Sequence, residues 1–275
     1  MFTQNPFATL SAVLPASVMQ TYLVLMVLLV VAGTLYDVVH KGSARYFFAN
    51  WRKSRDKGAR PLGGGEMASI AVKTALVDVL ASGEFCNPRR RLAHLLTMYG
   101  FVLYAGTSVI MVFGYPTPAA PTPDILPMLW WLGGLMVCAG GYWFWFFIRV
   151  DVAAEGHSPF RIMKADLFVL SLLASATLGL MWGAAGGGVG VLFALYIVAT
   201  TVLCAGVPWS KLAHMFFKPA AALEKRVAEA NGSAENLPTQ TRDDPEQRQR
   251  HSMELLRDAP MNMGLGIKRE APRHY

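Results

Sequence analysis

The sequence predicts an all-α membrane protein, a bundle of five membrane-spanning helices. Apolar residues make up 53% of the 275 residues and charged residues only 16%, against about 25% charged residues in a typical soluble domain. The apolar residues form five runs, each close to the roughly 20 residues needed to cross a bilayer. Lys and Arg are absent from every second segment outside these runs. We therefore expect a transmembrane bundle with a periplasmic N-terminus and a cytoplasmic C-terminus.

The first run covers positions 18–39 and is expected to persist as a helix. Residues 1–17 carry no positive charge, and the run is longer than the apolar part of a cleavable signal peptide. We expect residues 1–17 to lie in the periplasm. The polar segment that follows, 40–91, is rich in Lys and Arg. It is expected to form a basic inner loop.

The second and third runs cover 92–113 and 127–148. The third run contains the glycine pairs 133–134 and 140–141, which allow two helix backbones to approach each other. Tryptophans stand near both ends of this run and are interpreted as anchors at the membrane interfaces. They are Trp130, Trp131, Trp143 and Trp145.

The last two runs cover 167–185 and 191–209. In the fourth run a small residue recurs at every fourth position, at Ser171, Ser175, Gly179 and Gly183. Small residues at this spacing favour a compact bundle. Plain packing explains the pattern, although a close approach also leaves room for a flat cofactor between helices.

Charge predicts the orientation of the membrane domain, residues 18–217. Segments 1–17, 114–126 and 186–190 contain no Lys or Arg, whereas segments 40–91 and 149–166 and the residues after 209 contain all of them. Positive segments remain on the cytoplasmic side of a bacterial inner membrane. The net charge of +7 is then explained by topology and anionic lipid, and we expect no nucleic-acid partner.

The polar tail, 218–275, is not expected to bury a core of its own. It mixes both charge signs with Pro, Gln, Asn and Gly, and has short helical signals at 220–230 and 253–257. Two interpretations remain open. The tail is either extended and disordered, or it folds against a cytoplasmic partner, as the apolar stretch 261–267 suggests.

Two histidines near the cytoplasmic ends of helices are candidate metal ligands. His94 lies at the start of the second run and His214 follows the last one. Two neutral imidazoles can bind a haem iron axially, and Arg90, Arg91 and Lys211 could pair with the propionates. The alternative is a pair of interfacial histidines that bind headgroups. Weaker candidates are His40 and His157, and the widely spaced Cys86, Cys138 and Cys204 indicate neither an iron-sulfur nor a zinc site.

Two segments carry a family resemblance. The stretch FCNPRRRLAHLLTMYGF at 85–101 and the stretch PWSKLAH at 208–214 resemble the haem b membrane subunits of the nitrate reductase gamma family. Within that family the chain is most similar to the membrane domains of quinone-interacting oxidoreductases and to the membrane anchors of adenylylsulfate reductase. The resemblance covers about residues 68–219 and implies five helices with the N-terminus outside.

The resemblance also implies which haem ligands are present. Its inner haem ligands fall on His94 and His214, whereas its outer ligands fall on Tyr104 and Tyr196. Neutral tyrosine is a poor axial ligand for a low-spin b haem. We therefore expect one haem b near the cytoplasmic face instead of two. The chain begins almost at once with its first helix, so the electrons are expected to come from a separate protein.

The preferred hypothesis is a membrane subunit, non-catalytic or reactive only toward quinone. It would pass electrons between a cytoplasmic iron-sulfur flavoprotein, by resemblance adenylylsulfate reductase, and quinone. Tyr104 and Tyr196 are candidate quinone contacts on the outer side, and Asp37, His40 and Lys211 on the inner side, which we favour. A haem-free passive anchor is the alternative. A small transporter is disfavoured, because the five unequal runs show neither an internal repeat nor paired charges at mid-membrane.

Overall fold

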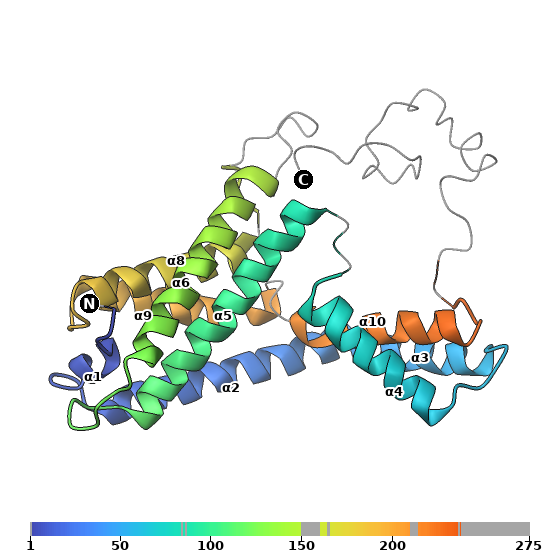
Figure 1. Cartoon of the computed structure of the whole chain (residues 1–275), viewed down its shortest axis with the longest axis horizontal. Helices are drawn as coiled ribbons and strands as arrows, with labels where there is room; N and C mark the ends of the chain where they lie inside the picture. The colour runs from blue at the N-terminus through green and yellow to red at the C-terminus, as the bar shows by residue number, and fades with distance from the viewer. Residues whose placement is uncertain are drawn as a thin grey trace.

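The computed structural model is all-helical over the part of the chain that it describes (Figure 1). That part comprises residues 2–83, 85, 87–149, 160–163, 166–209, 214–235 and 237, with the backbone alone for 209 and 214–216. The elements are α1 (Pro6–Leu10), α2 (Ala16–His40), α3 (Ser43–Asp56), α4 (Gly64–Lys73), the π-helix η1 (Thr74–Leu80), α5 (Pro88–Gly114), α6 (Ile125–Trp143), the π-helix η2 (Phe144–Ile148), α8 (Leu167–Ala184), α9 (Val191–Ala205), the 3₁₀ helix η4 (Val207–Trp209) and α10 (His214–Ala230).

Four helices are long and apolar enough to cross a membrane: α2, α5, α6 continued by η2, and α8. They coincide with the first four apolar runs, which confirms a multi-pass membrane character. The fifth run forms α9, an apolar helix of 15 residues that continues into η4. Because α9 alone is shorter than about 20 residues, the fifth crossing remains a prediction.

The three segments without Lys or Arg meet at one end of the bundle, which we call the α1 end. The Asn5 side chain donates to the Tyr115 carbonyl and to the Thr122 hydroxyl, at 2.9 and 3.0 Å. Gly187 packs against the backbone of Pro6. The segments around residues 5, 115–122 and 187 therefore share one side of the bundle, with the basic helix α3 beyond the other end of α2 (Figure 1).

The glycine pairs of α6 allow the close helix approach that the sequence predicted, and the structure shows that they serve two neighbours. A Cβ at Gly133 would lie 2.6 Å from the Tyr104 backbone nitrogen, and one at Gly140 would lie 2.7 Å from the Ala93 carbonyl, both on α5. The adjacent glycines face α8, because Cβ atoms there would meet Leu180 and Leu173. In each pair, the first glycine thus allows α5 to approach and the second allows α8 to approach.

The tryptophans of α6 and η2 correct one expectation. Trp130 is 0% exposed, and its indole Nε1 donates to the Ser108 hydroxyl at 3.0 Å. Trp131 and Trp145 are also buried. The interpretation as interfacial anchors is therefore wrong for these three residues, because other side chains of the protein cover their rings: Phe7 and Tyr104 at Trp130, Phe2 at Trp131 and Arg149 at Trp145.

The basic segment 40–91 forms helices that pack against α10. Figure 1 shows α3, α4 and α10 gathered beyond the end of α2. Arg226 of α10 donates to both carboxylate oxygens of Asp78 in η1, at 2.5 and 2.9 Å. Asn231 donates to the Ser54 carbonyl at 3.0 Å, which fixes the far end of α10 to α3. The first part of the predicted tail is thus an ordered helix, while residues 238–275 lie outside the described part.

Two helices begin at an Asn-Pro pair. The Asn5 side-chain oxygen accepts from the backbone N–H groups of residues 7 and 8, and Asn87 accepts in the same way at α5 from those of residues 89 and 90. Asn satisfies N–H groups that have no partner within the helix, and Pro fits the first helical position. The second of these caps fixes the start of α5 and therefore the position of His94 on the second turn of that helix.

Candidate functional site

His94 lies on the second turn of α5, at the end opposite α1, beside the segment that links η1 to α5. Its Nδ1 atom is 3.0 Å from the Ser82 hydroxyl oxygen. The ring of Phe85 packs against it, with 4.9 Å between ring centroids. A histidine that binds a metal through one ring nitrogen usually has the other nitrogen in a hydrogen bond that fixes its tautomer and orientation. The Ser82 contact is of that kind.

The start of α10 lies close to His94. Lys218 Nζ is 5.7 Å from the centroid of the Phe85 ring, which in turn contacts His94. Position 214 is one helical turn before position 218, so both occupy one side of α10. His214 opens the helix, and its side chain is outside the described part of the structure, as is all of Lys211.

The two arginines predicted to pair with haem propionates differ in their contacts. Arg91 Nε donates to the Ala81 carbonyl at 2.7 Å, so its guanidinium fastens the η1–α5 link to α5. Arg90 is half-buried beside it. The structure therefore gives Arg91 a structural contact that the sequence did not indicate.

The structure brings Tyr104 and Tyr196 together in the core. Both rings lie against Gly179, where an added Cβ would overlap the Tyr104 hydroxyl and lie 3.0 Å from Tyr196 Cε2. Tyr104 stacks on Trp130 at 5.1 Å and Tyr196 stacks on Trp182 at 5.5 Å. Each tyrosine is 6% exposed. The space between α5, α8 and α9 at this depth is thus filled by the chain's own aromatic rings.

Among the described side chains, an imidazole is present at the inner haem position and none at the outer one. At the inner position His94 is supported by Ser82, and Lys218 of α10 lies close to the Phe85 ring that contacts it. At the outer position, the phenol rings of Tyr104 and Tyr196 offer no good axial ligand and occupy the space themselves. Among the described residues, no group of three or more His, Cys, Asp and Glu could hold a metal ion.

Two of the three inner quinone candidates, Asp37 and His40, lie on the last turns of α2, and the third, Lys211, lies outside the described part. Asp37 is 2% exposed and forms an ion pair with Lys41. One turn earlier, the buried Thr34 hydroxyl has no hydrogen-bond partner among the described residues. His40 is exposed and stacks on Tyr36 at 5.3 Å. A buried carboxylate in a membrane helix marks a functional-site candidate, so Asp37 is the better supported of these residues.

The chain is similar to a known citrate utilization protein. It is 29% identical over 204 residues to citrate utilization protein B of Escherichia coli, a match that covers 67% of this chain and 52% of that protein. The chain thus spans about half the length of this curated relative. No protein-family model and no solved structure matches the chain.

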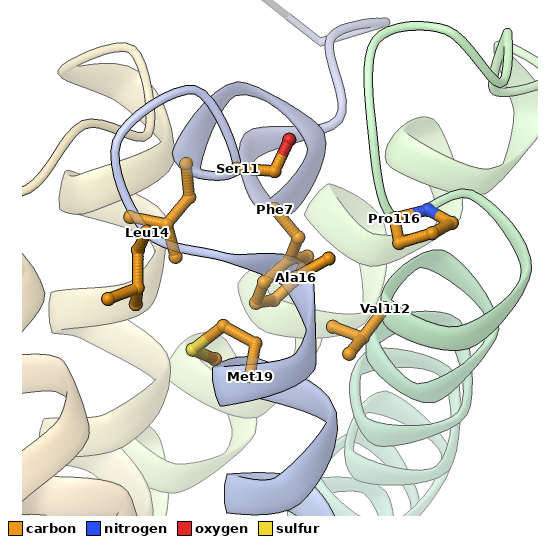
Figure 2. Close-up of a pocket in the computed structure, with 8 residues that line it drawn as sticks. Phe7, Ser11, Leu14, Ala16, Met19, Val112 and Pro116 are labelled. Atoms are coloured by element: carbon orange, nitrogen blue, oxygen red, sulfur yellow. The ribbon is translucent and has the colours of Figure 1, made fainter.

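Sequence reasoning missed Ser82, Asp78 and the role of the N-terminal segment. No local pattern marks Ser82, since its contact with His94 spans twelve positions. The N-terminal Phe7 packs edge-on against Trp182 at 5.3 Å. Figure 2 shows a small, mostly apolar hollow between this segment, the start of α2 and the end of α5. It is lined by Phe7, Leu10, Ser11, Leu14, Ala16, Met19, Val112 and Pro116.

Proposed function

We propose that the chain is a membrane subunit that holds one haem b through His94 and His214 and passes electrons between a cytoplasmic iron-sulfur flavoprotein and quinone. The observation that carries the proposal is the setting of His94, whose Nδ1 contacts Ser82 and whose ring is linked through Phe85 to Lys218 of α10. Haem iron supplies one-electron chemistry when bound. The chain's part is to set the position and surroundings of the iron.

The proposal includes a five-span topology in a bacterial inner membrane. The charge-free segments meet at the α1 end, and the helices with most Lys and Arg lie beyond the other end. By the positive-inside rule the α1 end faces the periplasm. The helices α3, α4 and α10 then form the cytoplasmic surface on which a soluble redox partner docks.

A reduced-minus-oxidised spectrum of the purified chain tests the proposal. We expect a b-type band at one haem per chain. The band should be lost in His94→Ala and in His214→Ala, and retained in His157→Ala. Tyr104→Phe and Tyr196→Phe should retain it too, because these residues lie in the aromatic core. Absence of the band in the wild-type protein would show a haem-free anchor instead.

A quinone site near the cytoplasmic face is the second part of the proposal. Asp37 supports it, as a carboxylate 2% exposed near the end of a membrane helix. Replacement by Asn keeps the shape of the side chain and removes its charge. We expect Asp37→Asn to slow electron exchange between the haem and a quinone analogue at least about tenfold, with haem content unchanged. An unchanged rate would remove Asp37 from the quinone site.

Two settings are proposed for the partner. The family resemblance favours adenylylsulfate reductase, which interconverts sulfite plus AMP with adenylylsulfate. The similarity to citrate utilization protein B favours instead a partner that takes part in citrate utilization. Identification of the proteins that co-purify with the tagged chain distinguishes the two. Haem reduction by sulfite and AMP in the purified complex would support the first setting, and co-purification of a citrate-utilization protein without that reduction would support the second.

A further inference from the structure

We propose that Ser82 is the positioning residue for His94: it fixes the imidazole through Nδ1 and thereby tunes a haem bound at Nε2. The inference rests on the proposed function, and deepens it. Ser82 is 1% exposed, and its hydroxyl lies 3.0 Å from His94 Nδ1. The neighbouring residue Phe85 closes one side of the same imidazole. The hydrogen bond between Ser82 and His94 is therefore shielded from water, and it holds the imidazole ring in one orientation.

The backbone of Ser82 is held in a conformation that serine rarely adopts. Its φ angle is +49°, in the left-handed region, which costs a residue with a Cβ about 1 kcal/mol or more. Such a residue persists where its surroundings determine the backbone, and such positions cluster at functional sites. The next residue, Gly83, donates its N–H to the Val77 carbonyl at 2.7 Å, which closes the turn at the end of η1.

Three consecutive residues of this turn are fastened to α5. The Tyr99 hydroxyl donates to the Leu80 carbonyl at 2.8 Å, and Arg91 Nε donates to the Ala81 carbonyl at 2.7 Å. Ser82 follows directly and contacts His94. Because Arg91, His94 and Tyr99 all lie on α5, the helix holds the turn on both sides of the imidazole. The element before the turn is a π-helix, a form that is common at functional sites.

The same turn is tied to α10. Asp78, four residues before Ser82, receives two hydrogen bonds from Arg226. The helix that begins at position 214 is therefore joined to the segment that orients His94.

The chemistry of the contact predicts a direction for its effect. With Nε2 holding the iron, the Nδ1–H of His94 would donate a hydrogen bond to the Ser82 hydroxyl oxygen. Such a hydrogen bond makes the imidazole a stronger electron donor, which stabilises the oxidised metal. Removal of the acceptor should therefore raise the midpoint potential of the haem.

Four variants of the full-length protein test the proposal. Ser82→Gly tolerates the positive φ and lacks the hydroxyl, and Ser82→Ala lacks the hydroxyl but keeps the Cβ. Ser82→Cys keeps the shape with a weaker acceptor. Ser69→Ala, an exposed serine on the adjacent helix α4, is the matched control. The measurements are haem content, midpoint potential and the low-spin spectrum of purified, folded protein.

We expect Ser82→Gly and Ser82→Ala to raise the potential alike, Ser82→Cys to raise it less, and Ser69→Ala to leave it unchanged. Loss of haem from folded Ser82→Gly and Ser82→Ala, with haem retained in Ser69→Ala, would also support the proposal. Wild-type potential and haem content in both hydroxyl-free variants would overturn it, as would a shift in only one of them. Absence of haem from the wild-type protein would overturn the proposed function, and this inference with it.

Discussion

Gly179 shows how a single residue shapes the core near the α1 end. It lies on α8 where the rings of Tyr104 and Tyr196 approach from α5 and α9. The Tyr104 hydroxyl is buried against it. A small residue is therefore required at 179 because two large rings fill the space on either side.

The first prediction follows from this packing. Gly179→Ala should destabilise the folded protein by about 1–3 kcal/mol, the usual cost of overpacking, because the added Cβ would overlap the Tyr104 hydroxyl. The measurement is the thermal midpoint in detergent. The second-site change Tyr104→Phe removes the overlapping hydroxyl and should restore most of the loss.

A matched glycine provides the control. A Cβ at Gly106 on α5 would meet no atom within 4 Å, so Gly106→Ala should be neutral or stabilising by up to about 1 kcal/mol. Equal destabilisation by both alanine variants, or no rescue by Tyr104→Phe, would contradict the role assigned to the hydroxyl.

At the scale of elements, the short helix α1 closes one end of the bundle. Phe7 is 4% exposed and packs edge-on against Trp130 and Trp182, at 6.2 and 5.3 Å. Asn5 holds the segment in place through the Tyr115 carbonyl. The N-terminal residues thus belong to the core of the membrane domain.

The second prediction concerns this helix. Phe7→Ala should lower stability by about 3 kcal/mol, because it removes a buried aromatic ring and leaves a cavity between two tryptophans. The shift in thermal midpoint and the change in tryptophan fluorescence both report it. The control Val13→Ala alters a side chain that is 73% exposed and should change neither by a measurable amount.

The Asp78–Arg226 ion pair joins η1 to α10 and gives the third prediction. The Arg226 guanidinium lowers the pKa of the Asp78 carboxyl through its hydrogen bonds. Asp78→Asn should destabilise the docking of α10 by about 1 kcal/mol, measured as faster hydrogen exchange of α10 amides. Because the folded-state pKa is lowered, the charged pair contributes fully above the ordinary pKa of about 4. That contribution is lost as the pH falls through the lowered value.

Exchange at low pH and the ion pair between Lys225 and Glu229 supply the controls. Wild type and Asp78→Asn should converge in α10 exchange at a pH below the lowered pKa, once intrinsic exchange rates are corrected for pH. Lys225 and Glu229 form an exposed pair at 4.0 Å on the same helix, so Glu229→Gln should have little effect. A difference in α10 exchange between wild type and Asp78→Asn that stays constant at all pH values would show that the charge of Asp78 does not stabilise the docking of α10.

At the scale of the whole molecule, the distribution of charge predicts the orientation in the membrane. In a variant with Cys86, Cys138 and Cys204 replaced by Ser, a single cysteine is introduced at Ala119 or at Ser69. Cysteine at 119 should react with a membrane-impermeant maleimide in intact spheroplasts, because segment 114–126 has no Lys or Arg and is predicted by the positive-inside rule to face outward. Cysteine at 69 should react only after permeabilisation. The reverse pattern would overturn the topology.

The sequence predicted the elements better than their contacts. The apolar runs located α2, α5, α6 and α8, because crossing a bilayer demands a long apolar helix with no break. The same reasoning misjudged Trp130, which an interfacial pattern places at the membrane surface but which α5 and α8 enclose. Local composition reports the length and polarity of a helix, and says little about which neighbour covers a given side chain.

The sequence by itself determined the helical class, the four long apolar helices, the glycine pairs that allow close packing and the choice of His94 as a candidate ligand. Only the tertiary structure decided that Ser82 contacts His94, that Asp78 pairs with Arg226 across 148 positions, and that Tyr104 meets Tyr196 over Gly179. The physical reason lies in the range of the forces. Bilayer solvation acts on every segment separately, so it is visible in composition. Side-chain contacts depend on how the helices pack, which no single segment encodes.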